Sequence, residues 1–163
     1  KERIATLFDL NNVSNNNIAA LTRLQELQTA NGSWSWYKGM NGSSYVTAYI
    51  VELNARLAML THDKLSGAAL TMQNNAFAYL HQQALKEYQD MLKLQKTGAK
   101  PSGISGSALE YLYLIAISDV KVPESNKVAY NYYLSKLGDM LTNTSMDTKA
   151  TIAIILNKNL SLH

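Results

Sequence analysis

The chain has 163 residues, of which 47 % are hydrophobic and 17 % are charged. This balance is enough for a packed core and excludes an intrinsically disordered chain. Its 15 Lys and Arg against 12 Asp and Glu give a formal net charge of +3. Because these charges are scattered rather than clustered, we expect no nucleic-acid partner. No apolar run approaches the roughly 20 residues of a membrane span, so we expect none in this segment.

Apolar residues recur at spacings of three and four along the whole chain, which predicts an all-α fold of about seven helices. Asn15, Ser44 and Asp147 are expected to cap three of them, and Asn31-Gly32 is a stop signal. The expected helices cover residues 2–9, 15–30, 44–61, 71–96, 107–118, 123–141 and 148–157.

The expected helices alternate in character. Residues 71–96 and 125–141 carry charge, whereas 107–118 and 148–157 are almost wholly apolar. A two-layer helical ring requires this alternation, because its inner helices are covered on nearly all sides and its outer helices face water on one. We therefore expect an α/α-toroid-like array of helical hairpins, a partial toroid. In its last helix Ile152, Ile154, Ile155 and Leu156 are expected to be buried.

Both ends of the chain fall in sequence of helical character. The chain opens at Lys1, with neither an initiator Met nor a signal peptide, and closes on His163 just after an apolar helix. We expect residues 1–163 to form a single helical domain that is a fragment of a larger toroid domain in a multidomain parent.

The sequence offers few groups for catalysis or metal binding. It contains no Cys, which excludes disulfides, thiolate nucleophiles and sulfur-ligated metals. His62, His81 and His163 are far apart, so no metal and no cofactor is expected. Glu52 and Glu110 lie in apolar helices near Gly-rich loops, where a buried Glu can act as an acid or base, although a helix-dipole partner is the simpler interpretation of Glu110. We expect a protein that is not an enzyme.

Both Trp residues of the chain fall in one short loop. Trp34, Trp36 and Tyr37 would be wasteful on a free surface. If the segment is extended, alternation places both indoles on the same side. They can plug the junction between two helices, or form a platform on which a sugar or a peptide aromatic stacks, with Lys38 alongside.

The same loop carries a resemblance to a known family. Leu27-Gln28, three further residues, and then Gly-Ser-Trp-Ser-Trp-Tyr-Lys-Gly-Met are followed by Tyr45-Val46-Thr47-Ala48-Tyr49-Ile50-Val51. This pattern resembles the α/α-toroid, or thioester-type, domain of bacterial alpha-2-macroglobulins, and the similarity is close over residues 24–60. Ser33 replaces the second Gly of the family pattern, and Tyr37 replaces a Phe.

The resemblance implies a very large protein of the periplasm or cell surface that entraps proteases. In that family a bait region is cleaved, the molecule rearranges, and many members capture the protease through an internal Cys–Gln thioester. This chain has no Cys and cannot carry the thioester. The expected partners are the other domains of the same large chain and, through the parent, proteases. Gln28, Gly32, Trp34, Trp36, Tyr37 and Lys38 are the expected structural signature or binding residues.

Two alternatives stay open at the level of sequence. One is a helical peptide- or carbohydrate-binding module that uses the Trp34, Trp36 and Tyr37 loop. The other is an α/α-toroid enzyme such as a polysaccharide lyase. Gln28, Gly32 and Trp34 also resemble the short structural Gln-Trp motif of triterpene cyclases, where the Gln contacts the loop. A lyase would need a Tyr/His or Asn/His base pair, and the sequence places no His near its Tyr-rich segments.

Overall fold

The computed structural model describes residues 10–62, 64–98, 103–142 and 144–160 and, within residues 10–18, the backbone alone. The described part is all-α, as predicted, and contains no strand beyond two isolated β-bridges in the aromatic loop. The expected helix at residues 2–9 lies outside the described residues. The elements are α2 (Leu10–Leu27), α3 (Ser44–Thr61), α4 (Gly67–Lys96), α5 (Gly106–Ser118), a 3-10 turn η1 (Glu124–Asn126), α6 (Lys127–Ser135), α7 (Leu137–Met140) and α8 (Met146–Leu160).

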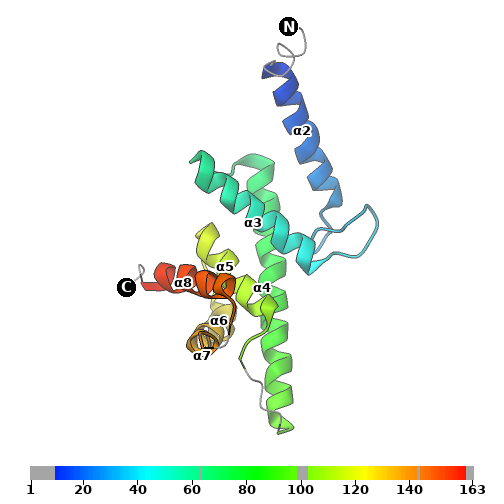
Figure 1. The fold of residues 1–163 in the computed structure, drawn as a ribbon. Helices are drawn as coiled ribbons and strands as arrows, with labels where there is room; N and C mark the ends of the chain where they lie inside the picture. Colours follow the sequence, from blue (N-terminus) through cyan, green and yellow to red (C-terminus); the bar gives the residue numbers. More distant parts are fainter. Residues whose placement is uncertain (1–9, 63, 99–102, 143, 161–163) are drawn as a thin grey trace.

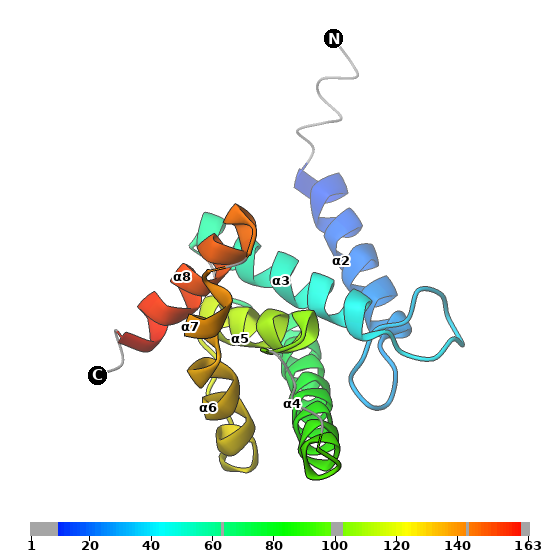
Figure 2. The same cartoon turned by 60° about the horizontal axis from the view of Figure 1, so that its bottom comes forward.

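The helices form two successions of neighbours. Helix α5 packs against α3 on one side and α8 on the other, whereas α4 packs against both α2 and α6 (Figures 1 and 2). Helix α4 also contacts α3 and α5, so it joins the two successions. Helices α3, α5 and α8 thus follow one another, as successive helices in one layer of the expected two-layer array would. Closure of such an array into a ring stays a prediction.

Helix α5 is the centre of the core. Its high apolar content predicts burial, and Leu112 and Leu114 are 0 % and 1 % exposed. Around them pack side chains from α3, α4, α6, α7 and α8. The fully or almost fully buried ones include Val51, Ala76, Phe77, Tyr133, Leu137, Ile152 and Ile155.

Several helix ends differ from the expected ones. Ser43 rather than Ser44 caps α3, because its side chain accepts a hydrogen bond from the Val46 amide. In α8 the hydroxyl of Ser145 accepts from the Thr148 amide, so Asp147 lies inside the first turn instead of capping it. Helix α2 begins at Leu10, which leaves Asn15 inside the helix.

Two further expectations about the helices need correction. The single helix expected at 123–141 is divided into η1, α6 and α7, with an i to i−3 hydrogen bond from the Lys136 amide to the Tyr133 carbonyl at the break. In α8 only Ile152 and Ile155 are buried, while Ile154 and Leu156 are exposed. The packed side of α8 is therefore narrower than its uniformly apolar sequence indicates.

Candidate functional site

The loop between α2 and α3 is fastened to α4 at its start. The side-chain amide of Gln28 donates to the carbonyl of Gly32 (3.0 Å) and to the carbonyl of Met72 in α4 (2.8 Å). Gly32 has φ +89°, and a Cβ atom there would lie 2.1 Å from the carbonyl oxygen of Asn75. Only glycine allows the loop backbone to lie this close to α4.

Trp34 joins the end of α2 to the start of α3. Its side chain is 1 % exposed, and its indole Nε1 donates to the carbonyl of Leu24 (2.8 Å). Its backbone amide donates to the hydroxyl of Thr47 in α3 (2.8 Å), and its backbone bridges to Gln28 and Ser43. We call Gln28, Gly32, Trp34 and Thr47 the clasp, since together they tie three helices through one loop.

Trp36 lies on the other side of this loop, in solvent. It is 58 % exposed and stacks on Tyr45, with ring centroids 6.1 Å apart and planes at 19°. Tyr45 in turn stacks on Tyr49 at 6.5 Å and 6°. We call Trp36, Tyr45 and Tyr49 the ladder. The expectation that both indoles share one side applied to an extended segment, whereas in the structure the chain bends at Trp36, Trp34 is buried and Trp36 is exposed.

Two more of the expected site residues lie beside the ladder without joining it. Tyr37 is 72 % exposed and belongs to no ring contact among the described residues. Lys38 pairs with Glu26 at 3.4 Å, with both side chains largely exposed. Such a surface ion pair contributes little to stability. The structure thus gathers the six expected residues in one loop but divides them between the clasp and the solvent side.

The ladder continues as an apolar row along α3. Tyr45, Tyr49, Leu53 and Leu57 recur every four residues and are all exposed. The row lies on the side of the helix opposite the buried Val51, because two residues along a helix turn the side chain by about 200°. A contiguous exposed apolar surface of this kind marks a place where another molecule or segment packs. We call these four residues the α3 ridge.

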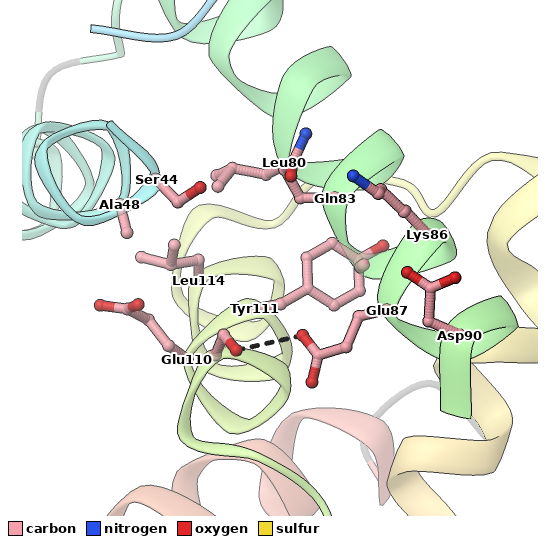
Figure 3. Close-up of a pocket in the computed structure, with 12 residues that line it drawn as sticks. Ser44, Ala48, Leu80, Gln83, Lys86, Glu87, Asp90, Glu110, Tyr111 and Leu114 are labelled. Carbon is pink, nitrogen blue, oxygen red and sulfur yellow. Dashed lines mark hydrogen bonds between the residues drawn. The ribbon is translucent and has the colours of Figure 1, made fainter. Parts of the chain in front are cut away.

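A pocket lies between α3, α4 and α5, with a volume of about 370 Å³. Figure 3 shows Glu110 on the side of the pocket near α3, and Glu87 and Asp90 on the side formed by α4. Burial, and secondarily the charge of Glu52, raises the pKa of the Glu110 carboxyl. The sequence singled out Glu52 and Glu110 separately, and the structure brings them near one another.

A buried polar pair, His81 and Tyr111, adjoins this pocket. Nδ1 of His81 and the hydroxyl of Tyr111 lie 2.8 Å apart and share a hydrogen bond, and the amide of Asn126 donates to the His81 carbonyl. Burial lowers the pKa of His81 to about 4 and raises that of Tyr111. Sequence reasoning missed this Tyr/His pair because the two residues lie 30 positions apart on different helices. Both side chains are buried, so the pair links α4 to α5 inside the core.

Other kinds of site are not found among the described residues. They contain no group of three or more His, Asp or Glu side chains placed to hold a metal ion. Nor does any helix in the described ranges have both the length and the apolar character to cross a membrane. Comparisons with family models, with curated proteins and with solved structures found no match for the chain.

Proposed function

We propose that this chain is a non-enzymatic helical segment of a bacterial alpha-2-macroglobulin-like protein, in which it packs against further helices of the same parent. The proposal includes a partial α/α-toroid, a parent in the periplasm or at the cell surface, and a role in protease trapping. The family assignment rests on the sequence resemblance over residues 24–60. The packing role rests on the surfaces of α3 and α8.

The single observation that carries the packing role is that the two end helices, α3 and α8, expose apolar side chains. Helix α5 packs against both α3 and α8, whereas α8 packs against α5, and α3 packs against α5 and α4. The uncovered side of α3 is the α3 ridge, and exposed apolar residues on α8 include Met146, Ile154 and Leu160. The terminal helices of a helical array need a polar outer face to stay soluble. Because these outer faces are apolar, they favour further helices packed beyond them.

The clasp supports a mechanical rather than a chemical role for the loop between α2 and α3. The side-chain N–H donors of Gln28 and Trp34, which could otherwise contact a substrate, are bonded to backbone carbonyls of the same chain. A movement of α2 is therefore transmitted directly to α3 and α4. Coupling of this kind suits a molecule that rearranges after a bait region is cut.

The proposal is tested first on the native gene product. An antibody raised against this chain should detect, in envelope fractions, a band many times larger than the chain itself. An added protease should cleave this large protein at one place and should then stay bound to it. Methylamine sensitivity would then show whether a thioester lies elsewhere in the parent. A small band in the soluble fraction alone would overturn the proposal.

The packing role has its own test on the α3 ridge. We expect the isolated chain to associate through this ridge as its concentration rises. Leu53→Glu with Leu57→Glu should leave its helicity unchanged and abolish that association. Gln82→Glu with Gln89→Glu, on exposed positions of α4, is the matched control and should leave association as it is. In the parent, the ridge variant should lose protease retention. Retention unchanged in the ridge variant would contradict the packing role and favour a ligand on the ladder.

A further inference from the structure

We propose that the pocket between α3, α4 and α5 binds an alkylammonium group, such as the side chain of a lysine or a free aliphatic diamine. This inference goes beyond the packing role and does not depend on the family assignment. It rests on the shape of the pocket, on one carboxylate that has no partner in the part of the chain that the structure describes, and on one aromatic ring.

The pocket has the size and lining of a site for an aliphatic stem. Its volume of about 370 Å³ lies within the range of small-ligand pockets. Its apolar lining comes from all three helices and consists of Ala48, Leu80, Ala84 and Leu114. A chain of four or five methylene groups would remove this surface and its own from water, which is favourable.

Glu110 supplies the charge that an ammonium group needs. It lines the pocket, is partly buried, and makes no hydrogen bond or ion pair with any residue that the structure describes. Desolvation disfavours its ionised form, and the nearby Glu52 adds repulsion. A cation in the pocket would relieve both effects. In Figure 3 Glu110 lies on the side of the pocket near α3.

The other two carboxylates around the pocket already have partners. Glu87 accepts hydrogen bonds from Ser105 and, at 3.0 Å, from Ser107. Asp90 pairs with Lys93 at 2.7 Å and lies close enough to Lys86 for that lysine to lower its pKa as well. Lys86 itself lines the pocket on the α4 side, near Asp90. Glu110 is therefore the carboxylate left for a ligand.

Tyr111 presents an aromatic ring to the same space. Its hydroxyl is turned to His81 and bonded there, while the residue lines the pocket. The face of a tyrosine ring attracts a cation within about 6 Å. The side-chain amide of Gln83 also lines the pocket and has no hydrogen-bond partner among the described residues. Its carbonyl can accept one of the three ammonium hydrogens.

The test measures binding of Nα-acetyl-lysine methylamide to the chain of residues 1–163 by NMR titration of backbone amides. The norleucine analogue, which has the same stem without the charge, and cadaverine are titrated in parallel. We expect the lysine probe to shift the signals of Glu110, Gln83 and Leu114, and to bind at least tenfold more tightly than the norleucine probe. Cadaverine bound as tightly as the lysine probe identifies a free amine as the ligand, and weaker cadaverine binding identifies a peptide lysine. Either result supports the inference.

Matched variants locate the binding. Glu110→Gln should weaken the Kd of the lysine probe at least tenfold, whereas Glu124→Gln, on an exposed carboxylate outside the pocket, should leave it unchanged. Gln83→Lys should fill the pocket with its own ammonium and block the probe, with Gln89→Lys on α4 as its control. Circular dichroism checks the fold of each variant. No shift at 20 mM probe, equal binding of the norleucine analogue, or full binding by folded Glu110→Gln would each overturn the inference.

Discussion

Trp34 and Trp36 stand two residues apart in one loop, yet Trp34 is 1 % exposed and Trp36 is 58 % exposed. Trp34 belongs to the clasp, where its indole nitrogen is bonded to a backbone carbonyl. Trp36 belongs to the ladder, where its contact is another exposed ring. Two identical side chains thus contribute in different ways, one inside the fold and one on its surface.

The difference has a physical cause in the backbone. The amide and carbonyl of Trp34 are held by Thr47 and by Ser43, so this residue is fixed between the helices. Beyond it, the hydroxyl of Ser35 donates to the carbonyl of Tyr37, and the chain turns outward. What separates the two indoles is therefore a set of polar anchors rather than a difference in hydrophobicity.

Replacing each Trp residue by Ala tests the difference between Trp34 and Trp36 most directly. Trp34→Ala should lower the free energy of unfolding by about 4 kcal/mol, because it leaves a cavity between three helices. Trp36→Ala should cost less than about 1 kcal/mol, because it removes an exposed ring contact. Urea unfolding followed by circular dichroism measures both. Equal losses would mean that Trp36 is buried in solution, for example by self-association, and would contradict the division into clasp and ladder.

A second prediction compares two glycines of the same loop. Gly32→Ala should destabilise the fold by about 3 kcal/mol, since it combines a positive φ with a clash against the backbone of α4. Gly39 has φ +86° but no atom within 4 Å of the position of a Cβ. Gly39→Ala should therefore cost only about 1 kcal/mol, the conformational part alone. If the two variants lose the same stability by urea unfolding, close contact with α4 is not what Gly32 provides.

Much of this fold could be predicted from sequence because it depends on local spacing. The apolar period predicted the helices, and the almost wholly apolar character of residues 107–118 predicted that this helix would be covered on nearly all sides. The predicted helix ends were wrong where two residues that can each cap a helix are adjacent in sequence, as Ser43 and Ser44 are. Ile154 was expected to be buried because periodicity does not say how many sides of a helix find a neighbour.

The candidate site was predictable only in its loop. The motif predicted Gln28, Gly32 and Trp34 as a structural signature, and in the structure Gln28 is hydrogen-bonded to Gly32 and its backbone bridges to Trp34. The contrast between Trp34 and Trp36 was not predictable, since it depends on Thr47 and Ser43 in the next helix. The pocket and the His81 pair were missed for a similar reason. Their members come from different helices, and only the packing of those helices brings them together.

A third prediction concerns the effect of buried His81 on how stability depends on pH. Burial lowers its pKa from 6.5 to about 4. Between these pH values the unfolded chain binds the proton and the folded chain does not, so stability should fall as pH falls from 6.5 to 4, by about 2 kcal/mol. Above pH 6.5 this contribution should be constant.

The variant His81→Gln isolates that contribution. Its amide cannot titrate but can still bond to the Tyr111 hydroxyl. The raised pKa of Glu110 acts in the opposite direction, because that carboxyl is protonated more readily in the folded state. Stability measured by urea unfolding at several pH values should therefore fall less steeply toward pH 4 in His81→Gln than in the native chain. Identical slopes would show that His81 is open to solvent.

The variant with the smallest expected effect tests the ring stacking within the ladder. Tyr45→Ala removes the ring on which Trp36 stacks, and it should change the free energy of unfolding by less than about 1 kcal/mol because the contact is exposed. The indole NMR signal of Trp36 should nevertheless move, while that of Trp34 should stay in place. Tyr37→Ala, which removes an equally exposed ring outside the stack, is the matched control and should leave both signals unchanged. A shift of the Trp34 signal in Tyr45→Ala would mean that the ladder supports the clasp, because the two regions would then respond as one unit.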